Sequence, residues 1–160
     1  MNKLPAQITL RSAVWEDAEF LLSLRNDPLV CSQSIQARSV GRQEHLEWFK
    51  ETLQRNDVKL FIILDNGVPV GQVRYDLKHD GALVSMAIND GHRGKGLGAQ
   101  ALKQTSQKIF FLPEVKVLKA LIKEDNKASL RCFESTGFCP VGREKHGDGY
   151  FTLMELRKVF

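Results

Sequence analysis

Long apolar segments are missing from this sequence of 160 residues. No apolar run approaches the roughly 20 residues that a membrane-spanning helix needs. The first twelve residues, MNKLPAQITLRS, contain no apolar stretch of the kind that secretory signals carry. We therefore expect no membrane association and a cytoplasmic location.

Cysteine is also scarce, with only Cys31, Cys132 and Cys139 in the chain. Their number is odd, and their spacing does not match the short paired spacing of metal sites, so we expect free thiols in a reducing compartment. The four histidines are scattered along the chain and have no partner at ligand spacing. The sequence therefore predicts no metal site.

A strong excess of charge of either sign is absent as well. The chain has 23 basic and 19 acidic residues, a net charge of +4, with no run of Lys and Arg and no basic stripe between aromatic residues. We therefore expect no nucleic-acid partner. A basic pocket for a small phosphorylated ligand is compatible with the same charge.

The chain shows no repeat, linker or low-complexity tract, which favours one domain over residues 1–160. Apolar periodicity and turn residues predict a β-α-α-β-β-β-α-β-α-β-β order, a mixed α/β layer fold. Pro28 is expected to end the first helix, and residues 30–40 are expected to be irregular. The predicted strands are 7–14, two strands within 58–77 around a turn at 65–67, 82–90, 115–123, 138–145 and 149–159. The predicted helices are 15–27, 41–56, 96–111 and 126–137.

The stretch HRGKGLG, residues 92–98, follows a predicted strand and opens a predicted helix. Glycines at 94, 96 and 98 allow close approach of the backbone to a ligand, and free N–H groups at a helix start bind anions. Arg93 and Lys95 add positive charge at the same place. The stretch therefore predicts a phosphate or pyrophosphate site, the alternative being a connection that packs a helix tightly on a sheet.

Two common phosphate motifs do not fit. GLGAQA, residues 96–101, matches the dinucleotide pattern G-x-G-x-x-A, but antiparallel strands precede it and the length leaves no room for a second nucleotide-binding half. A P-loop is excluded because Lys95 is followed by Gly96 rather than Ser or Thr.

The segment VSMAINDGHRGKGLGAQAL, with its R-x-x-G-x-G pattern, resembles motif A of the GNAT superfamily of acetyl-CoA-dependent N-acetyltransferases. Asn126, Ser129, Phe133 and Gly137-Phe138 match a second pattern of that family. The resemblance covers essentially the whole chain. It implies a GNAT-like fold, with a mixed, mostly antiparallel twisted sheet of about seven strands, four flanking helices and splayed central strands.

The resemblance also implies where acetyl-CoA, the co-substrate, would bind. The coenzyme pyrophosphate would lie on the loop from Arg93 to Gly98, and the pantetheine arm would pair with the strand backbone. Lys127 and Arg131 are candidates for contacts with the 3′-phosphate. The residues implied to bind the coenzyme are Met86, Ala87, Ile88, Arg93, Gly94, Lys95, Gly96, Leu97, Gly98, Ala99, Asn126, Ser129 and Phe133.

The implied chemistry is attack of an amine on a thioester in a ternary complex, with the backbone N–H of Ile88 as the candidate donor to the carbonyl oxygen. The family often has a tyrosine as the acid where this chain has Phe133. Tyr150 is the candidate to replace it. Candidates for the base are Ser85, His45, Asp76 and His79.

The implied acceptor is a small-molecule amine, held by Arg25, Asn26, Arg38 and Trp48. The segments LRND, HLEWF and GQVRYD are similar to those of nucleotide-sugar amino N-acetyltransferases, such as the enzyme of pseudaminic acid biosynthesis. Their acceptor would be the amino group of a nucleotide-linked aminodideoxy sugar. A protein N-terminal amine, as in ribosomal-protein acetyltransferases, and a non-catalytic acyl-CoA-binding module stay open as alternatives, as do a monomer and a homodimer.

Overall fold

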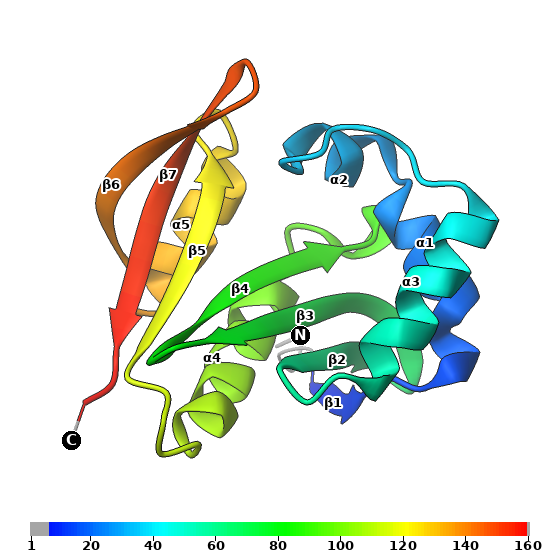
Figure 1. Cartoon of the computed structure of the whole chain (residues 1–160), viewed down its shortest axis with the longest axis horizontal. Helices are drawn as coiled ribbons and strands as arrows, with labels where there is room; N and C mark the ends of the chain where they lie inside the picture. Colours follow the sequence, from blue (N-terminus) through cyan, green and yellow to red (C-terminus); the bar gives the residue numbers. More distant parts are fainter. Residues whose placement is uncertain (1–6, 160) are drawn as a thin grey trace, which may run out of the picture.

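The computed structural model describes residues 7–159, which contain one sheet of seven strands in the order β1-β2-β3-β4-β5-β7-β6 (Figure 1). Neighbouring strands are antiparallel except β4 and β5, which are parallel. The expected mixed, mostly antiparallel sheet is therefore confirmed; residues 1–6 and 160 of the predicted domain lie outside the described residues. The strands are β1 (Ile8–Ser12), β2 (Val58–Asp65), β3 (Val68–Lys78), β4 (Gly81–Ile88), β5 (Val117–Lys123), β6 (Cys139–His146) and β7 (Gly149–Arg157).

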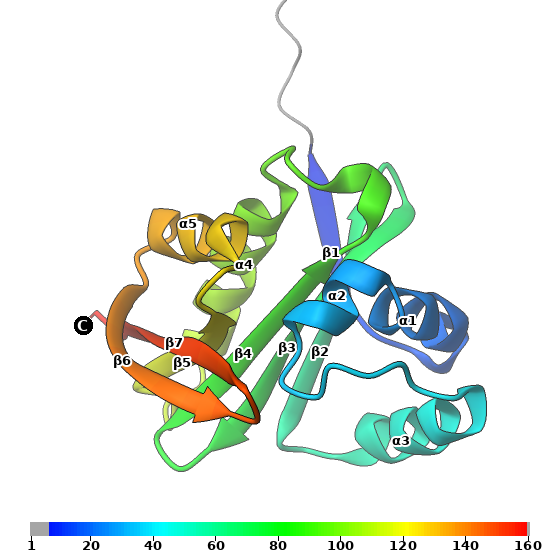
Figure 2. The same ribbon diagram turned by 90° about the horizontal axis from the view of Figure 1, so that it is seen from above.

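Helices cover both faces of the sheet. Figure 2 shows α4 and α5 on one side and α1 and α3 on the other. None of the helices within residues 7–159 is long and apolar enough to cross a bilayer. The α-helices are α1 (Ala18–Arg25), α2 (Pro28–Gln33), α3 (Arg42–Gln54), α4 (Leu97–Phe110) and α5 (Lys127–Ser135), and the short 3-10 turns are η1 (Trp15–Asp17) and η2 (Asp90–His92).

Helix α2 corrects the expectation of four helices and of an irregular segment after Pro28. Pro28 is the first residue of α2, where its missing N–H is not needed and its fixed φ suits a helix. The Asp27 carboxylate caps this helix by accepting bonds from the N–H groups of Leu29 and Val30, at 3.0 and 3.2 Å. The same proline that ends α1 therefore begins α2.

Two apolar clusters join the helices to the sheet. The larger lies under α4 and α5 and includes the fully buried Leu102, Leu118 and Met154. The smaller joins α1 and α3 to β2 around Phe49 and Ile62. Because side chains alternate along each strand, the face that carries the larger cluster is opposite the face that α1 and α3 cover.

Strands β4 and β5 pair only at their beginnings. Gly81, Ala82 and Leu83 lie opposite Val117, Leu118 and Lys119, and the two strands then separate (Figure 1). On its other edge, β4 pairs with β3 along its whole length. Within residues 7–159, the β5-facing edge of residues 84–88 therefore has no strand partner, and the expected splayed central strands are confirmed.

Tyr75 fixes α4 against this part of the sheet. Its buried hydroxyl lies 2.7 Å from Thr105 Oγ1 and 3.2 Å from Ser106 Oγ, both on α4. A phenylalanine at this position would leave the Ser106 hydroxyl buried without that partner.

We therefore expect Tyr75→Phe to lower the free energy of unfolding by about 1 to 2 kcal/mol in urea titrations. Tyr150→Phe is the matched control, since Tyr150 is exposed, and its effect should stay within about 0.5 kcal/mol. Equal effects of the two variants would show that Tyr75 does not anchor α4.

Candidate functional site

A pocket of about 770 Å³ occupies the space between the separated strands. Residues 83–88 of β4 line it on one side, and the end of β5 and helix α5 line it on another. The loop 92–98 and the start of α4 close one end, and residues of α2 cover the remaining side. All the residues predicted to hold the coenzyme line this pocket except Lys95 and Lys127, which are exposed.

The free edge of β4 presents peptide groups to the pocket. The N–H of Asn89 donates to the carbonyl of Val70 on β3, at 2.8 Å. Peptide groups of successive strand residues point to opposite edges, so the N–H groups of Ile88 and Met86 point away from β3. Both residues line the pocket, so its β4 side can pair with an extended chain that contains amides.

The start of α4 meets the same edge. Gly96 precedes the helix in the left-handed conformation, with φ of 76°, and provides no side-chain cap. The first N–H groups of a helix have no acceptor within it, and the helix dipole makes this end positive. Leu97 anchors the turn in the core, with 1% of its surface exposed. Since residues 96–99 line the pocket, this end of it is suited to bind an anion.

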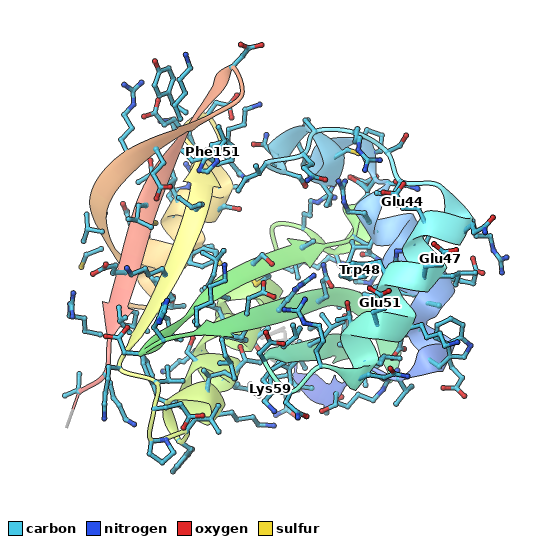
Figure 3. The ribbon with its side chains drawn as sticks, viewed as in Figure 1. Glu44, Glu47, Trp48, Glu51, Lys59 and Phe151 are labelled. Atoms are coloured by element: carbon cyan, nitrogen blue, oxygen red, sulfur yellow. The ribbon has the colours of Figure 1, made fainter. Side chains whose placement is uncertain are left out.

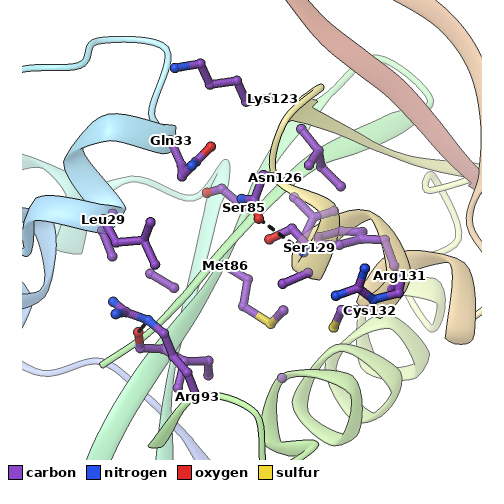
Figure 4. Close-up of a pocket in the computed structure, with 18 of the residues that line it drawn as sticks. Leu29, Gln33, Ser85, Met86, Arg93, Lys123, Asn126, Ser129, Arg131 and Cys132 are labelled. Carbon is purple, nitrogen blue, oxygen red and sulfur yellow. Dashed lines mark hydrogen bonds between the residues drawn. The ribbon is translucent and has the colours of Figure 1, made fainter. Parts of the chain in front are cut away.

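Arg93 lies in the pocket lining (Figure 4), but its guanidinium group already bonds protein oxygens. It donates to the Ile88 carbonyl at 3.0 Å and to carboxylate oxygens of Asp27 and Asp90 at 2.9 and 3.3 Å. Burial raises the pKa of Asp27, but the bonds from Arg93 and the Val30 N–H outweigh it and hold that pKa below its ordinary value. Arg93 therefore joins the glycine loop to the N-terminus of α2.

The second sequence pattern builds the α5 side of the pocket. Asn126 caps α5 by accepting a bond from the N–H of Ser129, at 3.2 Å (Figure 4). Phe133 is buried and packs edge-on against Phe138, with ring centroids 5.0 Å apart. Gly137 takes a φ of 102° in the turn that follows the helix. Asn126 and Phe133 therefore hold α5 in place.

The family described as "Acetyltransferase (GNAT) domain" matches residues 7–139. This chain belongs to that family. It is a GNAT-type N-acetyltransferase.

Comparison with known proteins supports this family assignment. The chain is 30% identical over 111 residues to "Uncharacterized N-acetyltransferase YfmK" of Bacillus subtilis (strain 168), covering 68% of this chain and 72% of the relative. It is similar to spermidine N-acetyltransferase from Vibrio cholerae in complex with CoA and spermine, with a TM-score of 0.87, 19% identity, and 94% and 95% of the two chains covered. It is also similar to AAC(6')-Ib in complex with ribostamycin and coenzyme A, with a TM-score of 0.82, 20% identity, and 94% and 93% covered. The two solved structures share the GNAT fold with this chain.

Three side chains predicted as the base, Asp76, His45 and His79, lie outside the pocket lining. Asp76, on β3, pairs with Arg74 at 2.8 Å. His45 is buried between α3 and α1, with Nε2 2.9 Å from the Ala18 carbonyl. Burial lowers the pKa of His45, and the bond to Ala18 offsets this only in part. The ring is therefore neutral at pH 7 and joins two helices. His79 lies in the turn between β3 and β4, outside the pocket lining.

Tyr150 also lies outside the pocket lining. Its neighbour Phe151 lines the pocket, and alternation along β7 directs Tyr150 to the opposite face. The guanidinium carbon of Arg143 lies 3.7 Å from the centroid of its ring. The other tyrosine, Tyr75, is buried under α4, so both tyrosines are away from the site. Ser85 does line the pocket.

The side chains predicted to hold the acceptor are occupied with other contacts. Arg25 donates to the Gln36 carbonyl at 2.8 Å, and Asn26 bonds both backbone groups of Val40 at 2.7 and 2.8 Å. These bonds hold the loop that follows α2.

Arg38 and Trp48 have partners as well. Arg38 pairs with Glu44 at 2.8 Å. Trp48 projects from α3 toward the sheet, where the Arg74 guanidinium lies 5.2 Å from the ring centroid (Figure 3). None of the four predicted acceptor residues lines the pocket.

Sequence reasoning missed the α2 side of the pocket, including Leu29 and Gln33, and also Lys123 at the end of β5. The signal for α2 was the pair Asp27-Pro28, a cap residue followed by a proline suited to the first helical position. Within residues 7–159, no group of three or more His, Cys, Asp or Glu side chains could hold a metal ion.

His45 should affect folding rather than acetyl transfer. The unfolded chain takes up a proton on histidine below about pH 6.5, while folded His45 has a lowered pKa and resists protonation. Its stabilising contribution is therefore present above pH 6.5 and is lost as the pH falls through the folded pKa.

We expect His45→Gln to lower the free energy of unfolding at pH 7.5 by about 1 to 3 kcal/mol and by less at pH 5.5, with kcat close to that of the wild type. Urea titrations at the two pH values and steady-state kinetics measure both effects. A large loss of kcat with unchanged stability would contradict the structural role.

Proposed function

We propose that the pocket binds acetyl-CoA and that the protein transfers the acetyl group to a primary amine of a small molecule, by direct attack in a ternary complex. The observation that carries this proposal is that the free edge of β4 leads directly to the start of helix α4. The unpaired β4 edge, which can pair with the amides of a pantetheine arm, ends at the uncapped start of α4, which can bind a pyrophosphate.

The pocket also fits acetyl-CoA in size and charge. Its volume of about 770 Å³ lies within the range of roughly 300 to 1,000 Å³ that is usual for ligand sites. Arg131 adds positive charge to its lining, which suits a ligand with several phosphate charges. Arg131, on α5, is the candidate for the 3′-phosphate, while Lys127 is exposed and outside the lining.

In the proposed reaction the amine nitrogen attacks the thioester carbon, a C–N bond forms, and the C–S bond breaks. Of the two backbone N–H groups that point to the pocket, that of Ile88, next to the glycine loop, can pair with the pantetheine arm. That of Met86, nearer the thioester, can stabilise the carbonyl oxygen. Phe133 has no proton to donate and both tyrosines lie elsewhere. We therefore propose that water protonates the departing thiolate and removes the amine proton, with the Ser85 hydroxyl as a relay.

The acceptor that we propose is a small cationic amine, such as a polyamine or an aminoglycoside. Arg38 and Arg42, which could hold a phosphate of a nucleotide-linked sugar, are paired with Glu44 and Glu19 at 2.8 and 2.6 Å. Exposed Glu47 and Glu51 follow Glu44 along α3 (Figure 3). These carboxylates lie outside the pocket lining, so the proposed acceptor class is supported by the similar enzymes, whose spermine and ribostamycin complexes provide suitable test compounds.

An acetylation screen tests this proposal. Release of free CoA thiol and the mass of the product are measured with spermidine, kanamycin and a UDP-linked amino sugar. We expect transfer to one of the first two compounds. Transfer to the amino sugar alone would contradict the proposed acceptor class, and no transfer to any amine would contradict the proposed function.

Gly96 tests the pyrophosphate site. A side chain at this position would meet no atom within 4 Å, and Asn and Asp are the residues that best tolerate a positive φ. We expect Gly96→Asp to weaken acetyl-CoA binding at least 100-fold in calorimetry, because its carboxylate would face the pyrophosphate.

Gly96→Asn is the matched control, with nearly the same shape and no charge, and its effect should stay within about fivefold. Both variants should have similar melting temperatures. If both variants lose acetyl-CoA affinity equally, the loss would come from a change of the backbone at residue 96 and not from repulsion between the carboxylate and the pyrophosphate.

Arg131 tests the position of the 3′-phosphate. The wild type should bind CoA about tenfold more tightly than 3′-dephospho-CoA, the value of one charge-assisted hydrogen bond. In Arg131→Ala this difference should disappear, because the variant loses affinity only for CoA. A difference that persists in the variant would assign the phosphate to another residue.

A further inference from the structure

Helix α2 is tied across the pocket at both ends. At its N-terminus the Asp27 carboxylate bonds Arg93 of the glycine loop, at 2.9 Å. Near its C-terminus the Ser32 carbonyl accepts a bond from Lys123 Nζ, on the last residue of β5, at 3.1 Å. The helix therefore runs from the proposed pyrophosphate end of the pocket to the end where β5 stops.

Gln33 follows Ser32 at the second of these ties, and it lines the pocket. Its side-chain oxygen Oε1 is buried and has no hydrogen-bond partner. Among the side-chain nitrogen and oxygen atoms of residues 7–159 it is the only one in that state. A buried polar atom without a partner destabilises a fold by roughly 1 to 3 kcal/mol. Because Gln33 itself lines the pocket, a turn of its side-chain amide would present Oε1 to a ligand, which could supply the missing partner.

The position of Gln33 indicates which part of the ligand it meets. Figure 4 shows Gln33 with Ser85 toward the end of the pocket away from Arg93. With the pyrophosphate on the glycine loop, the coenzyme extends along β4 toward that end with its thioester. The lining there includes the apolar side chains of Leu83, Leu121 and Phe151, which offer no oxygen to an incoming N–H group.

We propose that Gln33 Oε1 accepts a hydrogen bond from the attacking amine and thereby orients its lone pair toward the thioester carbon. This inference rests on the proposed function. An amide oxygen is not basic enough to take the proton, so the amine stays a nucleophile and its proton leaves to water after the C–N bond forms. The charge of nearby Lys123 favours the neutral form of the amine, which is the form that attacks.

The first test compares Gln33→Leu with Gln36→Leu, whose side chain is exposed on the following loop. With spermidine or kanamycin as the probe, kcat/KM for the amine should fall about tenfold in Gln33→Leu and stay within twofold in Gln36→Leu. The affinity of Gln33→Leu for acetyl-CoA should be unchanged, and its melting temperature should not fall, since no intramolecular bond is lost.

A weaker affinity for acetyl-CoA in Gln33→Leu would overturn the proposal by assigning Oε1 to a pantetheine amide. A lower melting temperature with unchanged kinetics would overturn it in favour of a structural role. If the wild type binds acetyl-CoA but acetylates neither probe, the proposed acceptor class fails, and the role of Gln33 falls with it.

Gln33→Glu provides a second readout. It keeps the acceptor oxygen but adds a negative charge, which favours the protonated amine in the complex. The pH dependence of kcat should therefore shift to higher pH by about one unit, with tight acetyl-CoA binding retained. An unshifted profile would show that the amine does not contact residue 33.

Discussion

The incomplete pairing of β4 with β5 is the constraint on which the site depends. The two strands share only three residue pairs, and their separation leaves the peptide groups of Met86 and Ile88 without a partner inside the sheet. Such a gap would destabilise a closed sheet, because buried backbone groups need hydrogen bonds. Here the gap is the ligand pocket, and the strand on the other edge of β4 keeps those groups in register.

The ends of the pocket are held by contacts between distant parts of the chain. Arg93 follows the pocket strand, yet its partner Asp27 lies 66 residues earlier. Lys123 reaches α2 across 91 residues of sequence. These two ties place α2 over the free β4 edge, so they also position Gln33, the side chain that we assign to the acceptor amine.

Much of the pocket lining around the glycine loop could be predicted because its determinants are local. The glycines around residue 96 need no distant partner to form the turn that opens α4. The hairpin at Asp65-Asn66-Gly67 forms for the same local reason, with φ of 51° at Asn66 and 78° at Gly67. Periodicity and turn residues likewise predicted the order of the strands, while the single sheet of about seven strands was implied by the family resemblance. Lys95 shows the limit of such reasoning, since a basic residue in a loop can point to solvent.

The contacts of the residues proposed from sequence for the base and the acceptor could not be predicted, because these side chains bond to tertiary partners. His45 is a helix residue of ordinary sequence context, and only the Ala18 carbonyl, 27 residues away, makes it a buried link. Arg38 and Trp48 have partners on α3 and β3 that periodicity does not reveal. Pro28 both ends one helix and begins another, and the choice depends on the Asp27 side chain.

Hydrogen exchange of the β4 amides, followed by NMR with and without acetyl-CoA, tests the central claim most directly. The N–H groups of Met86 and Ile88 should exchange more slowly when the coenzyme is bound, while those of Ser85 and Ala87, which already face β3, should change little. Protection of Met86 and Ile88 alone would place the pantetheine arm along the free edge. Unchanged exchange at both residues, under conditions where acetyl-CoA is bound, would contradict it.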